Sequence, residues 1–533
     1  MPAFNIRDFG AIPDGKTLCT AAIQRALDAC GQSGGGMVYV PPGVYLTGTL
    51  NLRSFTTLYV EGGAILLGSI RIEDYTPQSV LLAKGAQNIA LAGPGTIDGQ
   101  GHAFWEKLEV LPGSVPPLLK FGWTPQHYWR HAAKHSDGIV RLEGCCGVKI
   151  RDLTLQNSEC WTVHLLGCDD VVVDGLRIRN PLHGPNTDGI DLQACQNVHL
   201  ANCDIYTGDD AIVLKNRHPG YLRPCKNITV TNCILTTPSN GFKIGTESFC
   251  DFENIVFSNS VIKAALPGEP LAKVAASAID PERYGNVLAP KSGVAVETVD
   301  GANIRGVSVT NLVMRGVRAP VFVRLAHRGI HPTKQGAKVP PGTLEDVSIS
   351  NVTADGASCA SSLTGIPGHL IRNVILANLR VTSIGGGTRD LVGRELPERE
   401  SDYPEATGWG QMPCHGLFVR HAEGVRLRDL RLICEKPDAR PALVCHDAAD
   451  LRVEGLDLDK EVTADWLIEL RDVREATFRS TIPPRGTKTW VRVTGAKSTG
   501  IHLLPDAFRN VRNAVELGEG VPQDAVSLRP VSQ

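Results

Sequence analysis

Three aspartates in two short segments have the residue types and the spacing for acid–base chemistry. Asp188 lies in NTDGID, and Asp209 and Asp210 lie side by side in TGDD, 21 and 22 residues further along the chain. Grouped carboxylates raise each other's pKa and cost stability, so a purely structural protein has little reason to keep them. Hydrolysis of a glycosidic bond uses such a group, because one protonated carboxyl donates to the leaving oxygen while an ionised one activates water. The sequence therefore favours a hydrolytic site over a calcium site or solvated turn aspartates.

The elements that position these aspartates belong to a repeat of short strands. Six segments each have an alternating apolar strand and, four residues after its reference residue, an asparagine. The reference residues are Val198, Ile228, Ile255, Val307, Val347 and Val374, and the asparagines are Asn202, Asn232, Asn259, Asn311, Asn351 and Asn378. Weaker copies begin at Val148, Val171, Val425 and Leu451, and the first four steps are 23, 27, 30 and 27 residues. This period, without helices or leucine-rich spacing, predicts an all-β solenoid of stacked parallel strands.

Stacking in a solenoid places equivalent residues about 4.8 Å apart on neighbouring strands. Asp188 is therefore expected beside the Asp209–Asp210 pair, on adjacent strands of one sheet. The repeated asparagines are expected to form an amide ladder, in which each side chain donates to the next.

The cysteines follow the same register. Fifteen cysteines among 533 residues are far fewer than in a disulfide-dense fold, and none has zinc-binding spacing. Three precede their reference residue by three positions and two follow it by five: Cys168, Cys195 and Cys225, and Cys203 and Cys233. We therefore expect them to be reduced, buried side chains in stacked core positions.

The ends and long loops differ from the repeat. Residues 16–32 form a clear amphipathic helix, which is expected to cap the first coil, with the cap and first coils within residues 1–70. Three stretches interrupt the rhythm: 102–138, 264–292 and 384–412, the first with Trp105, Trp123 and Trp129. Long insertions in solenoids often shape a binding groove. We expect one continuous domain over residues 1–533.

The composition excludes several classes of function. The chain has 54 basic and 56 acidic residues without a basic stripe, so neither nucleic acid nor an anionic membrane is an expected partner. No apolar run is long enough to span a bilayer, and the first residues lack the pattern of a signal peptide. The expected location is the cytoplasm, or the periplasm or exterior if a leader has been trimmed; the oligomeric state stays open. No nucleotide-binding or serine-hydrolase motif is present, and no cofactor or metal is expected.

Six blocks between residues 4 and 315 carry a family resemblance. They read FNIRDFGAIPDGKTLCTAAIQRALDAC, GGGMVYVPPGVYLTGTL, GAILLGS, GTIDGQG, NTDGID and TGDDAIVLK. Together they resemble glycoside hydrolase family 28, the polygalacturonases and rhamnogalacturonases of pectin breakdown. The resemblance implies a right-handed parallel β-helix and inverting hydrolysis. It also implies that Asp209 is the general acid, that Asp188 and Asp210 hold and activate the water, and that Lys215 lies near the cleft.

Two blocks depart from the family pattern. The family's Gly-His-Gly block falls at Ser239-Asn240-Gly241, where Asn240 replaces the histidine. Its Arg-Ile-Lys block, which grips the uronate carboxylate, falls at Ala295-Val296-Glu297, which has no cation and gains an acid. Because arginine is the preferred fork for a carboxylate, plain polygalacturonate is expected to be a poor substrate. A neutral or deoxy sugar is the expected unit at the cleaved position.

The expected substrate contacts are polar residues near the aspartates in sequence or one coil away. They are His183, Asn186, Lys215, Asn240, Lys243 and Glu247. Lys243 and Glu247, one coil beyond the acid pair, are the expected replacement contacts for the substrate, against the alternative that they form a solvated pair on a turn. His164 and His199 lie in strands of the repeat and are expected to be core or rim residues.

Two other functions remain open. A polysaccharide lyase also commonly uses a β-helix, but it needs a base beside a uronate and a cation to neutralise the uronate carboxyl. A non-catalytic solenoid could bind carbohydrate without turnover. All three hypotheses have a polysaccharide or oligosaccharide as the partner, and they differ in the products they predict.

Overall fold

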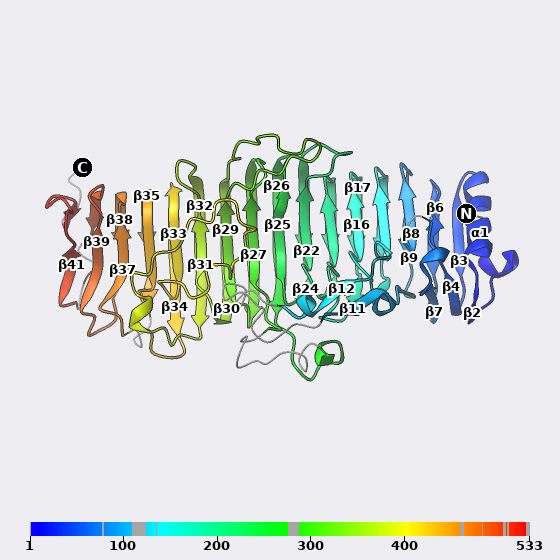
Figure 1. The fold of residues 1–533 in the computed structure, drawn as a ribbon, viewed down its shortest axis with the longest axis horizontal. Coiled ribbons are helices and arrows are strands. Elements are labelled where there is room, and N and C mark those ends of the chain that lie inside the picture. Colours follow the sequence, from blue (N-terminus) through cyan, green and yellow to red (C-terminus); the bar gives the residue numbers. More distant parts are fainter. Residues whose placement is uncertain are drawn as a thin grey trace. The chain divides into compact units, whose positions relative to one another are not determined.

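The computed structural model describes residues 2–76, 79–108, 124–134, 136–274, 287–458, 463–481, 483–504, 508 and 511–528. The chain divides into two compact units, Met1–Lys243 with Ile255–Pro290, and Ile244–Asn254 with Lys291–Gln533. Each unit consists of short parallel strands stacked coil upon coil (Figure 1). The predicted fold class, an all-β right-handed parallel β-helix, is confirmed. The expectation of one continuous domain stays a prediction.

The N-terminal end of the first unit is covered by helix α1 (Thr20–Gln32). The helix packs on β1 (Ala3–Asn5), β3 (Gly36–Val40) and β5 (Leu50–Asn51). Its buried residues are those of the expected apolar face: Ala22, Ile23, Ala26, Leu27 and Cys30. The predicted start at residue 16 was wrong, because residues 16–18 belong to β2 (Asp14–Leu18), which pairs with β4 (Gly43–Thr47).

Three parallel sheets form the wall of the first unit. The first sheet contains β8 (Leu81–Lys84), β13 (Val140–Glu143), β16 (Val163–Leu166), β19 (Ile190–Gln193) and β22 (Ile212–Asn216). The second contains β9 (Ala90–Ala92), β14 (Cys146–Arg151), β17 (Asp169–Asp174), β20 (Gln196–Ala201) and β23 (Cys225–Thr231). The third contains β7 (Ala64–Gly68), β10 (Thr96–Asp98), β15 (Thr154–Gln156), β18 (Arg177–Arg179), β21 (Asp204–Tyr206) and β24 (Ile234–Thr236).

Alternation along each strand separates the core from the outer face. In β19 and β22, Ile190, Leu192, Ile212 and Leu214 are fully buried and face their equivalents in register. Because successive residues of a strand point to opposite faces, Asp191 and Lys215 lie on the outer face of the first sheet. The buried apolar columns thus fix which polar side chains are presented outward.

The repeated asparagines share one backbone conformation, at bends between strands for Asn202 and Asn232 and within long strands for the other four. All six have φ between 52° and 59°, in the left-handed region that asparagine tolerates better than most residues. The amide ladder is confirmed in three of the links: Asn232 donates to Asn202, Asn351 to Asn311 and Asn378 to Asn351. Asn259 instead donates to the Thr231 hydroxyl. The asparagine is therefore repeated because it tolerates the left-handed backbone conformation and can also hydrogen-bond across coils.

The cysteines are free thiols, and eleven of the fifteen are buried. Cys145, Cys168, Cys195 and Cys225 are all buried and share the register position three residues before the reference residue. The Sγ atom of Cys195 donates to the Leu165 carbonyl at 3.1 Å. Burial raises the pKa of Cys225 to about 12, so this thiol stays protonated and unreactive at neutral pH.

We expect thiol titration in denaturant to recover fifteen cysteines per chain, because none is bonded to another. In the native protein a thiol reagent should react first with Cys146, the exposed cysteine of the set. The measurement is a colorimetric thiol count with and without denaturant. A count in denaturant that is several thiols below fifteen would reveal disulfides and contradict the stacked-core interpretation.

The second unit has the same construction. One row of parallel strands contains β27 (Ser292–Thr298), β29 (Ala319–Leu325), β31 (Ser361–Thr364), β33 (Leu417–Glu423), β35 (Leu443–Glu454), β37 (Trp466–Arg471), β39 (Thr489–Thr494) and β41 (Asn513–Leu517). Another contains β28 (Ile304–Arg315), β30 (Glu345–Ala357), β32 (Ile371–Ser383) and β34 (Arg426–Cys434), and continues through the end of β35 to β38 (Arg474–Arg479), β40 (Thr499–Leu503) and β42 (Val526–Ser527).

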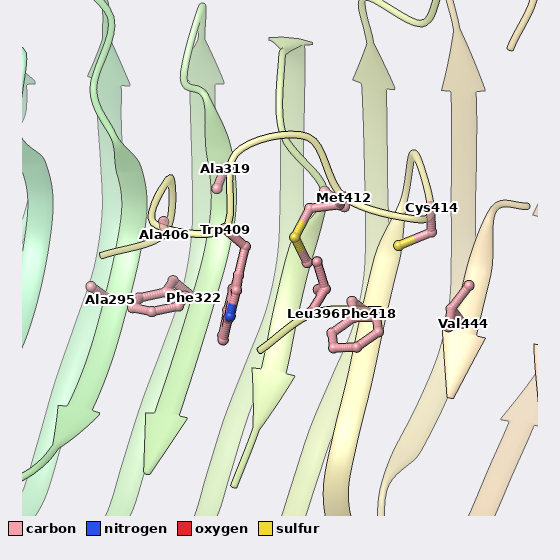
Figure 2. Close-up of a cluster of buried hydrophobic side chains, with 11 residues drawn as sticks. Ala295, Ala319, Phe322, Leu396, Ala406, Trp409, Met412, Cys414, Phe418 and Val444 are labelled. Atoms are coloured by element: carbon pink, nitrogen blue, oxygen red, sulfur yellow. The ribbon is translucent and has the colours of Figure 1, made fainter. Parts of the chain in front are cut away.

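The predicted insertions leave this regular pattern. Within 102–138, β11 (Trp105–Lys107) pairs antiparallel with β12 (Trp129–His131), while Trp123 lies outside the described residues. Insertion 264–292 is described at residues 264–274 and 287–292. Insertion 384–412 packs apolar side chains against outward-facing residues of β27, β29, β33 and β35 (Figure 2). In the described parts of the chain, no helix is long and apolar enough to cross a membrane.

Candidate active site

The three aspartates lie where the chain enters two neighbouring strands of the first sheet. Asp188 precedes β19 by two residues, and Asp210 precedes β22 by two residues. The amide of Gly189 donates to the Asp210 carbonyl at 2.9 Å, so the two aspartates occupy equivalent positions of adjacent coils. The spacing read from the sequence therefore predicted the neighbouring positions of these residues.

A buried network of hydroxyls and one amide fixes the turns that carry the aspartates. The Asn180 side chain donates to the hydroxyls of Thr162 at 2.8 Å and Thr207 at 3.0 Å. The Thr207 hydroxyl in turn donates to the carbonyl of Thr187, the residue before Asp188. These four network residues are fully buried, where an unmade hydrogen bond is costly. The network therefore ties the turns before Asp188 and Asp209 to the same buried side chains.

Lys215 joins two buried carboxylates. Its Nζ lies 3.0 Å from Asp188 Oδ2 and 2.6 Å from Asp191 Oδ1, and 3.7 Å from the centre of the Trp161 ring. Asp188 is 2% exposed and Asp191 is 0% exposed. Burial raises the pKa of Asp188 well above its usual range and that of Asp191 to about 7, although Lys215 opposes both shifts. Because burial outweighs the effect of Lys215, these two carboxyls retain a proton to higher pH than an exposed aspartate does.

Asp210 has the opposite electrostatic environment. Its Oδ1 accepts hydrogen bonds from the Ser239 hydroxyl at 2.8 Å, the Asn240 amide nitrogen at 3.2 Å and the Asn240 side chain at 2.7 Å. Its Oδ2 lies 3.2 Å from Lys243 Nζ. Burial alone would raise the pKa, but Lys243, Lys215 and the hydrogen bonds outweigh it and lower the pKa of Asp210 to about 2. Asp210 is therefore an ionised carboxylate at neutral and mildly acidic pH.

Asp209 is the more accessible member of the pair. It is half-buried, and its Oδ1 accepts from the Asp210 amide at 2.9 Å. The exposed Asn186 side chain donates to Asp209 Oδ2 at 3.4 Å, and the Thr237 hydroxyl donates to the Asp209 carbonyl at 2.5 Å. The backbone is thus held while the side chain stays partly exposed, as is required of a residue that donates a proton to a substrate.

His183 lies among aromatic side chains of the 102–138 insertion. Its ring centroid is 5.7 Å from Trp105 and 4.9 Å from Trp129. Burial lowers the pKa of His183 to about 4, so the imidazole is neutral at neutral pH. Asn186 is tied to the same insertion, since its amide donates to the Gln126 side chain at 3.0 Å. The insertion thus packs beside the loop that leads into Asp188.

The other predicted contacts fall into separate groups. Asn240 and Lys243, at the start of β25 (Asn240–Ser248), are buried against Asp210. The alternative of a solvated turn is wrong for Lys243, which is 3% exposed in a strand. Glu247 is half-buried at the other end of β25, in the second unit. The expected rim and core histidines are placed as predicted: His199 is exposed on β20 and His164 is buried on β16.

The block that replaces the family's Arg-Ile-Lys lies in β27 of the second unit. Ala295 is fully buried in an apolar cluster with Phe322 and Trp409, under insertion 384–412 (Figure 2). Glu297 is 1% exposed, and its register partner on β29 is Arg324. Both positions are therefore enclosed within the second unit.

Three residues of the site were not predicted from the sequence to be part of it. Asp191 shares Lys215 with Asp188, Ser239 binds Asp210, and Trp161 lies against Lys215. Two signals were available: Asp191 is the second acid of NTDGID, and in the repeat Trp161 falls one coil before Asp188. Lys215 was expected near the cleft, but its bonds to Asp188 and Asp191 could not be foreseen, because they depend on the rotamer of a long side chain.

The site combines one strongly ionised carboxylate, one partly exposed carboxyl and a pair of buried carboxylates bonded to the same lysine. Such differently tuned groups are the requirement for simultaneous acid and base assistance. In the described part of the chain, no group of three or more acidic, histidine or cysteine side chains is arranged to hold a metal ion. The acidic side chains instead have lysine and amide partners.

Comparisons with known proteins concern both the sequence and the fold. Residues 30–268 match the family model described as glycosyl hydrolases family 28. A probable polygalacturonase of Vitis vinifera is 26% identical over 405 residues, which cover 70% of this chain and 73% of the relative. An exo-poly-alpha-D-galacturonosidase of Dickeya chrysanthemi is 25% identical, over 71% of this chain and 67% of the relative.

Among solved structures, a family 28 exopolygalacturonase of Yersinia enterocolitica superposes with a TM-score of 0.59. The match covers 89% of this chain and 78% of that chain, at 22% sequence identity. At that identity the likeness concerns the fold, whereas the family match over residues 30–268 concerns the sequence that carries the carboxylates.

Proposed function

Residues 30–268 belong to glycosyl hydrolase family 28 and contain every carboxylate of this site, and on this basis we propose that the chain is an inverting glycosidase. Its proposed substrates are pectin-related or other polysaccharides. Plain polygalacturonate is proposed to be a poor substrate. The glycosidase activity follows from the family. The environment of Asp210 is the observation that carries the proposal on mechanism. A carboxylate held ionised by Lys243 and three hydrogen bonds, next to an accessible Asp209, supplies a base and an acid on adjacent residues.

The roles follow from the two environments. Asp209 donates its proton to the glycosidic oxygen, and the bond from that oxygen to the anomeric carbon breaks. A water held by Asp210 and Asp188 attacks the anomeric carbon from the opposite face, and its proton passes to Asp210. Burial raises the pKa of Asp188 and of Asp191, and both are bonded to Lys215, so Asp188 orients the water and does not act as the principal base. Attack from the opposite face inverts the anomeric centre.

The proposed preference for a neutral sugar rests on the cations. Within the first unit, Lys215 is bonded to Asp188 and Asp191, and Lys243 is bonded to Asp210. Ala295, which corresponds in sequence to the family's arginine, is enclosed among apolar side chains. A uronate at the cleaved position would therefore meet several carboxylates without a cation dedicated to it. Uncompensated like charges at a binding site cost on the order of several kcal/mol, which corresponds to orders of magnitude in affinity.

We expect early products from neutral galactose- or rhamnose-containing oligosaccharides to carry the inverted anomer, and polygalacturonate to be hydrolysed at least about 100-fold more slowly. Proton NMR in the first minutes of reaction identifies the anomer, and near-ultraviolet absorbance detects any unsaturated sugar left by elimination. A retained anomer would refute the assignment of water as the nucleophile. An absorbing product would identify a lyase, and fast hydrolysis of polygalacturonate would refute the neutral-sugar preference.

A further inference from the structure

The second unit carries a basic groove outside the site described above. A hollow of about 780 Å³ lies over β34, β35, β38 and β40. Four arginines line it, Arg426, Arg428, Arg452 and Arg479, together with His502. They face three carboxylates in the same hollow, Asp450, Glu454 and Glu475. Its volume falls in the range of roughly 300–1,000 Å³ typical of ligand sites.

The strand alternation directs these side chains outward. Leu427, Val453, Phe478 and Leu503 are fully buried and stand in register across the four strands. Their neighbours therefore form two outer columns, one of Arg426, Arg452, Thr477 and His502, the other of Arg428, Glu454 and Arg479. The second column alternates in charge, as a ladder of structural ion pairs would. The first column has no acid.

The first column places two arginines directly beside each other. Like charges opposite one another on neighbouring strands destabilise a sheet. Both arginines pair with the same carboxylate. Asp450 is bonded to Arg426, and its Oδ1 lies 3.5 Å from Arg452 Nε. Glu454 is engaged by Arg479 at 2.7 Å. The protein's own carboxylates therefore compensate this surface incompletely.

Two further groups at the groove are unsatisfied. Arg428 is exposed and has no ion pair within the described residues. The Nδ1 atom of His502 is buried and has no hydrogen-bond partner there. Arg452 keeps 67% of its side chain exposed despite its shared acid. Arg428 and Arg452 line the same hollow, where a ligand with several anionic groups would engage both guanidinium groups.

We propose that this basic groove binds a carboxylate-bearing stretch of polysaccharide independently of the catalytic carboxylates. Guanidinium forks match carboxylates in two-point contacts, which favours a uronate over a neutral sugar. Successive strands repeat their side chains about every 4.8 Å, so a linear chain with regularly spaced carboxylates can engage several rungs. The groove thus prefers acidic sugars of a polysaccharide, whereas the active site of the first unit prefers neutral ones. This contrast rests in part on the proposed neutral-sugar preference.

The test measures binding in the full-length chain carrying Asp209→Asn, so that turnover does not consume the ligand. The probe is a size-defined oligogalacturonate, titrated calorimetrically at two salt concentrations. Arg428→Gln with Arg452→Gln should raise Kd about tenfold or more, because each removes charge-assisted hydrogen bonds. The Lys variants at both positions, which keep the charge without the fork, should bind with intermediate affinity.

The matched control is Arg305→Gln with Arg315→Gln, which removes the same charge from exposed ion pairs on β28. Unchanged binding in the Arg428 and Arg452 variant, or an equal loss in the control, would overturn the proposal. Equal affinity for an oligonucleotide of the same charge would show a general anion surface and overturn the assignment to polysaccharide. The calorimetric result does not depend on turnover, so it stands whether or not the proposed hydrolysis is correct. Turnover of a small neutral substrate by the otherwise unaltered chain should be unaffected by the groove variant.

Discussion

Asp209→Asn is expected to fold as the parent does and to lose about 10²–10⁴-fold in kcat, the usual contribution of a general acid. Asparagine has nearly the size of aspartate but cannot give a proton to the glycosidic oxygen. The position tolerates it because Asp209 is half-buried, and the support from Thr237 reaches its backbone carbonyl rather than its side chain. The measurements are kcat on the substrate that the parent cleaves best and a thermal melt.

A surface aspartate provides the matched control. Asp204 lies in the same unit and forms an exposed ion pair with Arg179 at 2.5 Å. Asp204→Asn should therefore keep kcat within about twofold, since isolated surface pairs contribute little. If Asp209→Asn retains more than a few per cent of parental kcat while Asp204→Asn is normal, another group donates the proton and the assignment is wrong.

Lys243→Met is expected to have two effects, on stability and on the pH dependence of catalysis. Removing one partner of a buried ion pair costs about 3–5 kcal/mol, because Asp210 is left with an uncompensated charge. The pKa of Asp210, held at about 2 in the parent, should rise toward or above its ordinary value of 3.8. The acidic limb of the kcat/KM profile, which reports the base, should then move to higher pH.

The folded-state pKa of Asp210 lies below the unfolded value, so its contribution to the unfolding free energy is full above about pH 4 and is lost as pH falls through about 2. The difference in unfolding free energy between parent and Lys243→Met should thus be largest above pH 4 and shrink in more acidic solution. Denaturant titrations between pH 3 and 7 measure it.

Two comparisons distinguish a positioning role for Lys243 from a substrate contact. Lys243→Arg, which keeps the charge, should restore most of the acidic limb, while Arg53→Gln, at an exposed pair with Asp28, should leave it unchanged. If Lys243→Met instead lowers kcat/KM for acidic substrates alone, at unchanged pH dependence, the lysine is a subsite cation. Efficient hydrolysis of plain polygalacturonate by Lys243→Ala would contradict both roles.

The coil architecture could be predicted because asparagine both adopts the positive φ that each coil requires and hydrogen-bonds to the neighbouring coil. Asn202 and Asn232 adopt positive φ and also hydrogen-bond across coils, so the repeat is visible as a single letter at fixed spacing. The same spacing placed Asp188 next to Asp210. Residues whose role is set by the period alone are thus readable from sequence.

The pairing of side chains within the site could not be read in this way. Lys243 was expected to meet the substrate, yet it is bonded to Asp210, and Lys215 is bonded to Asp188 and Asp191. A long side chain can reach several carboxylates. Which of them it pairs with depends on burial and on the other hydrogen bonds of each carboxylate. The enclosure of Ala295 was also unforeseeable, because the residues that cover it come from insertion 384–412.

The apolar cluster beneath that insertion has a consequence for the order of folding. Coils of a solenoid add one after another, since each contacts only its neighbours. The cluster is different, because it joins Ala295 on β27 to Val444 on β35 and needs Trp409 between them (Figure 2). During synthesis, Trp409 and Met412 emerge before β33 and β35 are available to receive them. The second unit is therefore expected to pass through a stage in which these side chains are exposed to water, and a chain interrupted before residue 443 should aggregate.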